Sequence, residues 1–257
     1  MEEKNPIQSA ERIFKILELL AYQGEMGLLE LSEASGLNKS TVHRLLSSLI
    51  YMGYARQNEA TQKYALSFKI VNMAGKMLER TDILPIARPY LEKLSQLSGE
   101  TVHLVQREGN HILYIDKVEA TAGSIRMVSH IGMVRPMYCS GVGKAIMATM
   151  SDEEVMQIWN ESVIEKKTEH TITDLTHFKQ VLAEVRSLGY ALDDEENELG
   201  VRCIAACIYD YHRYVKYAFS ISGPISRMTP EHICSLSKDV LNVQKELSHA
   251  LGYEKMA

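Results

Sequence analysis

The sequence lacks the features of a secreted or membrane-bound protein. Its start, "MEEKNPIQSAERIFKILELL", contains no basic segment followed by a continuous apolar stretch, so a secretory signal is not expected. No run of about 18 apolar residues occurs anywhere in the chain, which argues against a membrane-spanning helix. We therefore expect a cytoplasmic protein with no membrane partner.

Cysteine is scarce, and its spacing argues against common metal sites. The chain has four cysteines, which form no CxxC pair and show no zinc-finger spacing: Cys139, Cys203, Cys207 and Cys234. In a reducing compartment such residues are usually buried or partly buried free thiols. The sequence thus predicts neither a metal site nor a cofactor.

A strong positive charge is also missing. The net charge of −5 at pH 7 argues against a wholly basic nucleic-acid binder. Within the first 69 residues, however, eight Lys or Arg balance eight Glu, and no acid occurs from Asn38 to Ala55. Any DNA-binding surface is therefore expected to be local and modest.

The first 69 residues predict a winged helix-turn-helix domain. Apolar residues at helical spacing indicate helices within residues 12–21, 28–36 and 38–53, with Asn38 as the N-cap of the third. Two alternating runs, residues 54–57 and 62–66, flank a polar turn and predict a β-hairpin. The apolar stripe of the third helix consists of Val42, Leu45, Leu46 and Leu49.

The polar face of the third helix is expected to bind DNA. A helix face that is merely solvated usually mixes acids with bases, whereas this one has no acid. Hydroxyls, a cation and an imidazole near a helix N-terminus suit base edges and phosphates, and the hairpin adds polar groups for the neighbouring backbone or minor groove. The predicted DNA-binding residues are Lys39, Ser40, Thr41, His43, Arg44, Ser47, Arg56, Gln57 and Lys63.

A linker helix is predicted at residues 70–83, and a separate domain at residues 84–257. The apolar surface of the linker needs a partner, either the core or a second copy of the chain. In the second domain, helices are expected at residues 84–98, 141–149, 151–159, 174–188 and 230–250, and strands at residues 101–108, 111–119, 124–130, 203–211 and 214–222. This order predicts an α+β domain around one covered antiparallel sheet.

The glycine turn in "YCSGVGKAIMATM", residues 138–150, looks at first like half of a phosphate-binding loop. The first glycine of such a loop would fall on Tyr138, and the hydroxyl that binds magnesium would fall on Ala145. A nucleotide site is therefore not expected, but free amides at a helix N-terminus can still bind a small anion. Lys144, one residue into the helix, is expected to point to solvent.

Two further patterns indicate a ligand pocket. One carboxylate of the acidic run at residues 193–198 is expected to turn inward, although no histidine stands beside the run at metal-ligand spacing. Ser220 and Ser222 share one face of a strand, and Cys203 begins the partner strand. No GxSxG motif surrounds Ser222, so a serine hydrolase is poorly supported.

Taken together, these segments resemble the IclR-type bacterial transcription regulators along essentially the whole chain. "SAERIFKILELLA" and the following helix-turn-helix segment are similar to that family's DNA-binding domain. "YCSGVGKAIMA", "TEHTIT", "GYALDDEENELGVRCIAACIYD" and "SISGPISR" are similar to its effector domain, in the same order.

The resemblance implies a GAF-like effector domain, a homodimer or dimer of dimers, double-stranded pseudo-palindromic operator DNA, a small carboxylate effector and no catalysis. The positions that match the family's effector contacts are Gly141, Val142, Asp193, Cys203, Ser220 and Ser222. Members that bind two- or three-carbon oxo acids often have alanine at the position of Val142, so the larger side chain here is expected to reshape the pocket.

The predicted function is a sequence-specific DNA-binding transcription regulator, expected to be a repressor, under the control of a small carboxylic acid. A 2-oxo acid, a sugar-derived keto acid and an aromatic acid all stay open as effectors. One alternative is an acid–base or metal-dependent enzyme that acts on a small carboxylate and has a helical appendage. The other is a protein-interaction scaffold that uses the winged helix without DNA.

Overall fold

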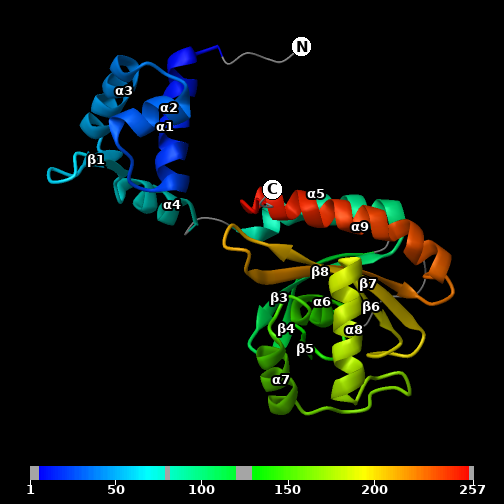
Figure 1. Ribbon diagram of the computed structural model, residues 1–257. Helices are drawn as coiled ribbons and strands as arrows, with labels where there is room; N and C mark the ends of the chain where they lie inside the picture. The colour runs from blue at the N-terminus through cyan, green and yellow to red at the C-terminus, as the bar shows by residue number, and fades with distance from the viewer. Residues whose placement is uncertain (1–5, 79–81, 120–128, 255–257) are drawn as a thin grey trace. The chain divides into compact units, whose positions relative to one another are not determined.

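The computed structural model describes residues 6–78, 82–119 and 129–254, and the chain divides into two compact units, Met1–Thr81 and Asp82–Ala257 (Figure 1). Among these residues no helix has both the length and the apolar character needed to cross a membrane. The separate linker at residues 70–83 stays a prediction.

The N-terminal unit is the predicted sequence of three helices, a hairpin and a further helix. Its elements are α1 (Gln8–Gln23), α2 (Leu28–Ser35), α3 (Lys39–Tyr51), β1 (Ala55–Gln57), β2 (Tyr64–Leu66) and α4 (Lys69–Leu78). The hairpin strands pair antiparallel, and Met26 pairs with Tyr64, which attaches the hairpin to the segment before α2. The winged helix-turn-helix prediction is therefore confirmed.

The core of this unit comes from the stripes that the helical periodicity picked out. Ile16 and Leu20 of α1, Leu31 of α2 and Leu46 of α3 are all buried in one cluster. Asn38 does occupy the N-cap position of α3, but its side chain accepts no hydrogen bond from the helix. Burial of the apolar stripe, at about 25 cal/mol per Å², is therefore what holds α3 in place rather than its cap.

Within residues 82–119 and 129–254, the C-terminal unit is built on a six-stranded antiparallel sheet with the strand order β5-β4-β3-β8-β7-β6. Its strands are β3 (Thr101–Glu108), β4 (His111–Val118), β5 (Val134–Pro136), β6 (Ala191–Asp194), β7 (Val201–Tyr209) and β8 (Val215–Pro224). Its helices are α5 (Ile83–Ser98), α6 (Gly141–Met147), α7 (Asp152–Glu161), α8 (Leu175–Leu188) and α9 (Pro230–Ala250).

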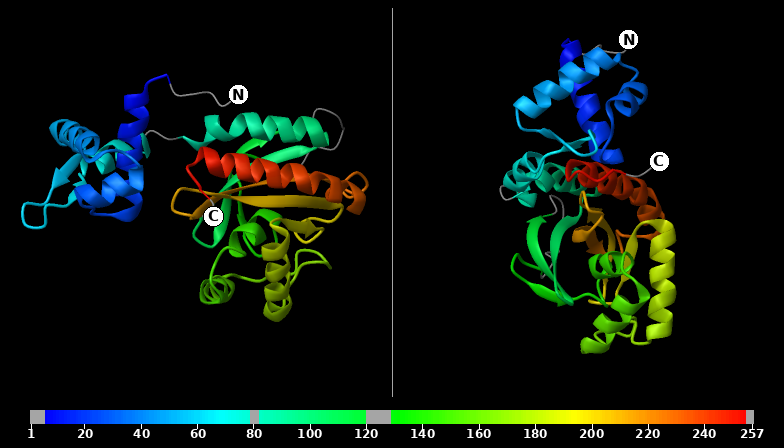
Figure 2. Two further views of the ribbon diagram at one scale, coloured as in Figure 1. Left: turned by 45° about the horizontal axis from the view of Figure 1, so that its top comes forward. Right: turned by 60° about the vertical axis from the view of Figure 1, so that its left-hand side comes forward.

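Helices cover both faces of this sheet, as Figure 2 shows. On one face α5 and α9 lie side by side, and a cluster that includes Leu91, Phe219 and Val240 fills the space beneath them. On the other face α6 packs against β7 and β8, over a cluster that includes Ile146 and Ala205. Each face is thus a separate apolar core, and the site described below lies on the α6 face.

The α+β prediction is confirmed, with two differences. The short edge strands β5 and β6 were not expected, because three or four residues are too few to show an alternating pattern. The strand expected at residues 124–130 falls mostly outside the described residues, and Ser129 and His130 are not in a strand. The architecture is compatible with the GAF-like domain that the resemblance implied.

Candidate ligand cavity and DNA-binding face

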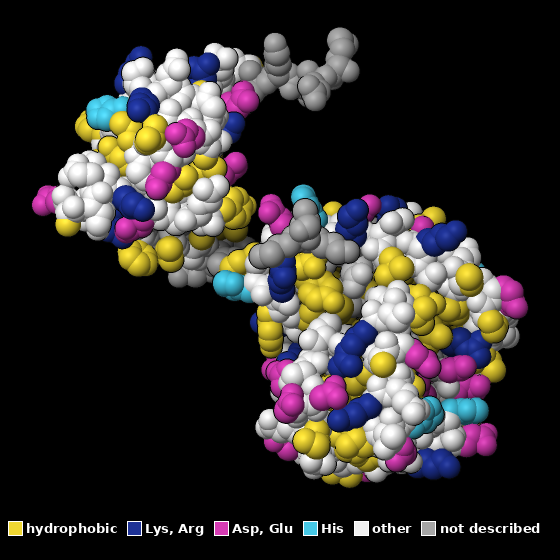
Figure 3. Space-filling view, in the orientation of Figure 1, with side chains coloured by type: hydrophobic (Ala, Val, Ile, Leu, Met, Phe, Trp, Pro, Cys, Tyr) yellow, Lys and Arg dark blue, Asp and Glu magenta, His cyan; other side chains and the backbone are white. Residues whose placement is uncertain are grey.

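The polar face of α3 is exposed as expected. Thr41 is half-buried, and the other predicted residues of this helix are exposed: Lys39, Ser40, His43, Arg44 and Ser47. The Lys39 and Arg44 side chains make no hydrogen bond or ion pair to any described residue. Figure 3 shows Lys, Arg and His side chains gathered over α3. These cations are therefore available to an external partner such as a phosphate or a base edge.

The predicted residues of the hairpin are engaged within the unit itself. Arg56 lies 3.2 Å from a Glu25 carboxylate oxygen, and the Lys63 ammonium lies 3.9 Å from Glu30. Gln57 donates from its side-chain amide to the backbone carbonyl of Gln62 at 3.1 Å. Exposed ion pairs of this kind contribute about 0–1 kcal/mol to the free energy of unfolding. Because so little is lost when they break, they would weaken contacts of the hairpin with DNA without preventing them.

All six residues expected to contact an effector line one cavity of about 40 Å³ on the α6 face of the sheet. Gly141 and Val142 form the start of α6, Asp193 lies on β6, Cys203 on β7, and Ser220 and Ser222 on β8. The strand register explains why they meet, because Cys203 is directly opposite both Asp193 and Ser222. Their convergence is a structural fact, whereas their role in binding stays a prediction.

Several residues of the same cavity were missed. His103 of β3, Tyr114 of β4, Ser129, Arg135 of β5 and Asn197 also line it. His103 offered one signal in the sequence, because it is a polar residue between Val102 and Leu104 in an otherwise apolar run. The others gave none, since only the tertiary fold brings them to the cavity: strand pairing for Tyr114 and Arg135, and loops for Ser129 and Asn197.

The start of α6 presents unused backbone donors. The Ser140 hydroxyl caps the helix by accepting from the Gly143 amide at 3.1 Å, whereas the amides of Gly141 and Val142 have no acceptor among the described residues. A Cβ on residue 143 would lie 2.1 Å from the Met137 carbonyl oxygen. The second glycine of the turn, Gly143, therefore allows two backbone segments to approach each other closely, and does not make room for a phosphate.

Lys144 is buried, and the expectation that it points to solvent was wrong. Its side chain is 1% exposed and forms an ion pair with Glu196, a member of the acidic run that was not singled out. The other carboxylate oxygen of Glu196 is buried without a hydrogen-bond partner among the described residues. Folding places this lysine against the acidic loop that follows β6, an orientation that the sequence alone does not reveal.

Burial also changes the acidity of Asp193 and Glu196. Burial raises the pKa of the Asp193 carboxyl to about 7, although the positive charge of Lys144 opposes the change. Burial raises the pKa of Glu196 too, against the same lysine. One Asp193 oxygen accepts from the backbone amide of Glu196 at 2.9 Å, which fixes its orientation at the cavity wall. Asp193 can therefore change its protonation state close to neutral pH.

His103 lies at the centre of the polar network of the cavity. Its Nε2 atom is 2.7 Å from the Ser129 hydroxyl, and its Nδ1 atom is 3.3 Å from the Ser222 hydroxyl, which is itself 3.3 Å from that of Ser220. Burial, together with the charge of Lys117, lowers the pKa of His103 to about 3. The ring is therefore neutral, and donates from one nitrogen while it accepts at the other.

An ion pair between an exposed guanidinium and a buried carboxylate anchors the end of β8 beyond Ser220 and Ser222. Arg227 contacts both carboxylate oxygens of Glu100, at 2.5 and 2.7 Å, and Glu100 is buried. A Cβ on Gly223 would lie 2.6 Å from that carboxylate, so only glycine leaves room for it. The "SISGPISR" motif thus contains both the two serines of the cavity and the arginine whose ion pair with Glu100 holds their strand in place.

The cysteines largely match the expectation. Cys139 and Cys207 are buried, Cys203 is half-buried, and only Cys234 is exposed, which corrects the expectation for that residue. Burial raises the pKa of the Cys203 thiol, so it acts as a weak polar group rather than as a nucleophile. Within the described parts of the chain no group of three or more His, Cys, Asp or Glu is arranged to hold a metal ion.

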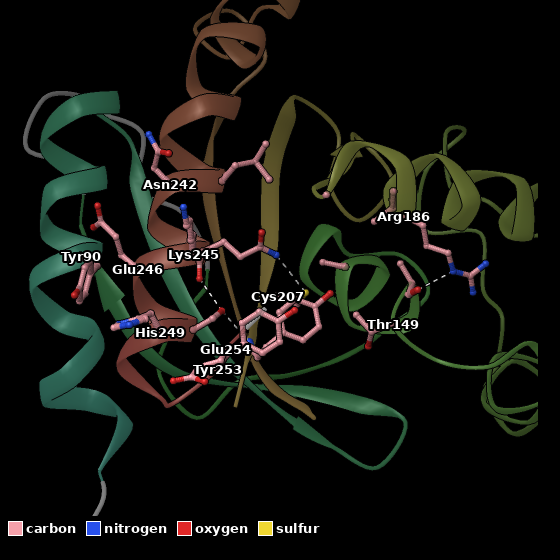
Figure 4. Close-up of a pocket in the computed structure, with 18 residues that line it drawn as sticks. Tyr90, Thr149, Arg186, Cys207, Asn242, Lys245, Glu246, His249, Tyr253 and Glu254 are labelled. Carbon is pink, nitrogen blue, oxygen red and sulfur yellow. Dashed lines mark hydrogen bonds between the residues drawn. The ribbon is translucent and has the colours of Figure 1, made fainter. Parts of the chain in front are cut away.

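A second, larger groove of about 1140 Å³ lies on the other side of α6, between α8 and α9 (Figure 4). Ala145, Ala148 and Thr149 line it, whereas Gly141 and Val142 of the same helix face the cavity. Arg186 closes one end by donating from Nε to the Ala148 carbonyl at 2.7 Å. The groove contains none of the predicted site residues.

Comparisons with known proteins agree with this arrangement. The profile "IclR helix-turn-helix domain" matches residues 9–59, and the profile "Bacterial transcriptional regulator IclR C-terminal" matches residues 75–249. The chain is 37% identical to the Transcriptional repressor IclR of Escherichia coli strain K12, over 96% of this chain and 90% of that protein. It is 39% identical to the DNA-binding transcriptional repressor YiaJ of the same organism, over 96% and 88%.

Solved structures give the same result. The Thermotoga maritima IclR structure superposes with a TM-score of 0.65 at 31% identity, covering 95% of this chain and 99% of that one. The Agobacterium tumefaciens repressor BlcR has the same fold, with a TM-score of 0.82 at 24% identity over 98% of this chain and 100% of that one. The chain therefore belongs to the IclR family of DNA-binding bacterial transcription regulators.

Proposed function

We propose that this regulator is a repressor that binds a pseudo-palindromic operator as a homodimer or dimer of dimers and is controlled by a small carboxylic acid. The observation that supports control by a ligand is the cavity in which the start of α6 meets Asp193, Cys203 and the two serines of β8. The ligand shifts the regulator between two states only if it binds one of them more tightly.

The DNA half of the proposal rests on α3. Its first two turns present Lys39 and Arg44, which have no partner among the described residues, on a face without acids, and this is the composition that a recognition helix needs in the major groove. In a dimer, two such helices would contact successive major-groove faces about 34 Å apart, or a multiple of that distance.

The dimer half of the proposal rests on α4. None of its described side chains is buried, even though Val71 and Met73 are apolar. The adjacent Phe68 is 84% exposed. Such a surface is costly in water, and the N-terminal unit itself does not cover it. A second copy of the same helix would cover it and at the same time pair two DNA-binding heads.

Replacement of Arg44 tests the DNA half. We expect Arg44→Ala to weaken binding to a fragment selected by the wild-type protein from random DNA by about 1–3 kcal/mol, since a bidentate contact with a base would be lost. Arg56→Ala, whose guanidinium already pairs with Glu25, should have a smaller effect. Gel-shift titrations of both variants give the comparison.

The oligomeric state is the control for this experiment. Arg44→Ala must sediment as the same dimer or tetramer as the wild-type protein. A monomeric wild-type protein would argue against the second copy proposed for α4, and unchanged DNA binding in both Arg44→Ala and Lys39→Ala would argue against α3 as the recognition helix.

The pH dependence of effector binding tests the cavity. A bound carboxylate beside Asp193 favours the protonated form of that residue, whose pKa is raised to about 7. Above pH 7 binding must therefore take up a proton, and the dissociation constant should rise about tenfold per pH unit, whereas below pH 7 it should stay nearly constant. Calorimetry at pH 6, 7, 8 and 9 measures the slope, and Asp193→Asn should abolish it. An equal slope in that variant would assign the proton to another group.

The alternatives lose support. The family consists of transcription regulators, which argues against an enzyme that acts on a small carboxylate. A protein-interaction scaffold that never binds DNA is disfavoured by the same relatives, two of which are named as repressors.

A further inference from the structure

The cavity offers more polar groups than a small oxo acid can use. A three-carbon oxo acid has three oxygen atoms and no donor of its own. The free amides of Gly141 and Val142 and the Asp193 carboxyl already account for these atoms. Ser220, Ser222, His103, Tyr114 and Arg135 would remain.

The serine and histidine network is only loosely satisfied. The Ser220–Ser222 hydroxyl contact is 3.3 Å, whereas an ordinary O–H···O bond is about 2.5–3.0 Å. The contact of the Ser222 hydroxyl with His103 Nδ1 is also 3.3 Å, at the long end of bonds between oxygen and nitrogen, which are about 2.7–3.2 Å. Each hydroxyl can donate one hydrogen bond and accept two, so capacity remains on both serines. A ligand hydroxyl that both donates and accepts would match these groups better than they match each other.

Two further groups are unpartnered. The Tyr114 hydroxyl and the Arg135 guanidinium make no hydrogen bond or ion pair with residues 6–78, 82–119 or 129–254. Both line the same cavity, and the charge of Arg135 opposes the rise in the pKa of Tyr114 that burial causes. A cation beside a free hydroxyl is suited to an oxygen-rich anion.

An aromatic acid fits poorly. The lining has few apolar side chains, and Val142, Met133 and Val201 are the non-aromatic ones among them. A ring placed over Ser220, Ser222 and His103 would remove water from these groups without replacing its hydrogen bonds. Aromatic side chains that could stack face to face on a ring are also few, because Tyr114 meets His103 edge-on, with ring centroids 5.2 Å apart.

We infer that the effector of this regulator is a hydroxylated aliphatic carboxylic acid, whose carboxylate pairs with Arg135 and whose hydroxyls are recognised by Tyr114, His103 and Ser222. The inference rests on the proposed function, because it names the class of ligand for the same cavity. A volume of about 40 Å³ holds only a few non-hydrogen atoms, so acids longer than three carbons require the half-buried Arg135 and Met133, at the edge of the sheet, to move outward.

Pairs of acids that differ in hydroxylation test the inference on the full-length protein. Calorimetry compares D-glycerate with pyruvate, and D-gluconate and D-galactonate with hexanoate, and includes benzoate as the aromatic acid. We expect D-glycerate to bind at least about tenfold more tightly than pyruvate, and at least one six-carbon hydroxy acid to exceed hexanoate by a similar factor.

Two conservative variants assign the contacts. Tyr114→Phe should weaken the hydroxylated acids about fivefold and leave pyruvate and hexanoate unchanged, since it removes one hydroxyl and keeps the ring. Arg135→Met should weaken every acid about 30-fold, because it removes the charge and keeps the stem. Tyr211→Phe, at an exposed tyrosine outside the cavity, is the matched control and should change nothing.

The outcomes separate this inference from the proposed function. If pyruvate, hexanoate or benzoate binds more tightly than every hydroxylated acid, the inference is wrong while control by a small carboxylate stands. Equal losses for both members of a pair in Tyr114→Phe would also overturn it. If none of the six acids binds, both the inference and the small-acid part of the proposed function fail, whereas the DNA-binding tests are unaffected.

Discussion

Lys144→Met is expected to destabilise the C-terminal unit by about 3–5 kcal/mol. The substitution leaves the Glu196 carboxylate buried, with one oxygen already without a hydrogen bond and the other now without its ammonium partner. Removing one member of a buried ion pair costs this much because the remaining charge has neither water nor a counter-ion. The size of the side chain is nearly kept, so the effect is electrostatic.

Urea unfolding followed by Trp159 fluorescence measures this loss. The chain has one tryptophan, and it lies in the core cluster next to α6, so the signal reports on the C-terminal unit alone. The double variant Lys144→Met/Glu196→Met should recover most of the free energy of unfolding, since no charge then remains unpaired. Lys179→Met, on the surface of α8, should stay within about 0.5 kcal/mol of the wild type. A single variant as stable as the wild type would show that Lys144 is not buried against Glu196.

Gly143→Ala is expected to destabilise the same unit by about 3 kcal/mol or more and to abolish effector binding. The added Cβ would lie 2.1 Å from the Met137 carbonyl oxygen and 2.5 and 2.6 Å from two further backbone atoms of that residue. Backbone cannot rotate away as a flexible side chain can, so the start of α6 must shift. That shift moves the Gly141 and Val142 amides that line the cavity.

Gly141→Ala provides a comparison two residues earlier in the same helix. Its added Cβ would meet Ala205 at 3.3 Å and the Asp193 amide at 3.4 Å, contacts that are tight but can relax by a few tenths of an ångström. We expect a loss of at most about 1 kcal/mol. Thermal unfolding of the two variants, again followed by Trp159, compares them directly. Equal stabilities would mean that the approach of Met137 to residue 143 is not a constraint on the fold.

The helices and the long strands could be predicted because their signals are local. The stripe on α3, the capping box of Ser151 and Glu154 on α7 and the alternation along β8 each lie within a few neighbouring residues. The cavity residues from Gly141 to Ser222 were found by resemblance to a family together with simple chemistry, namely a glycine turn before a helix and serines on an inward face. The structure then brought all six to one cavity.

The rest depended on contacts between residues far apart in the chain. Lys144 and Glu196 are 52 positions apart in the sequence, and His103 and Ser222 are 119 positions apart. No local sequence pattern can therefore predict that either pair is in contact. The wing cations Arg56 and Lys63 looked free in the sequence, but folding places Glu25 and Glu30 beside them.

The sequence by itself determined that the chain has a winged helix-turn-helix unit and an α+β unit. It also predicted which helix would contact DNA and which part of the α+β unit would hold a ligand. Only the tertiary structure decided which polar residues share the cavity. Strand order and register determine which residues lie next to Tyr114, Arg135 and Asp193. If a strand paired with another partner or in another register, different side chains would face α6. The glycine turn illustrates both contributions. Its sequence argued against a nucleotide-binding loop, whereas the fold showed that Gly143 makes room for the Met137 backbone and that the Lys144 side chain turns inward to Glu196.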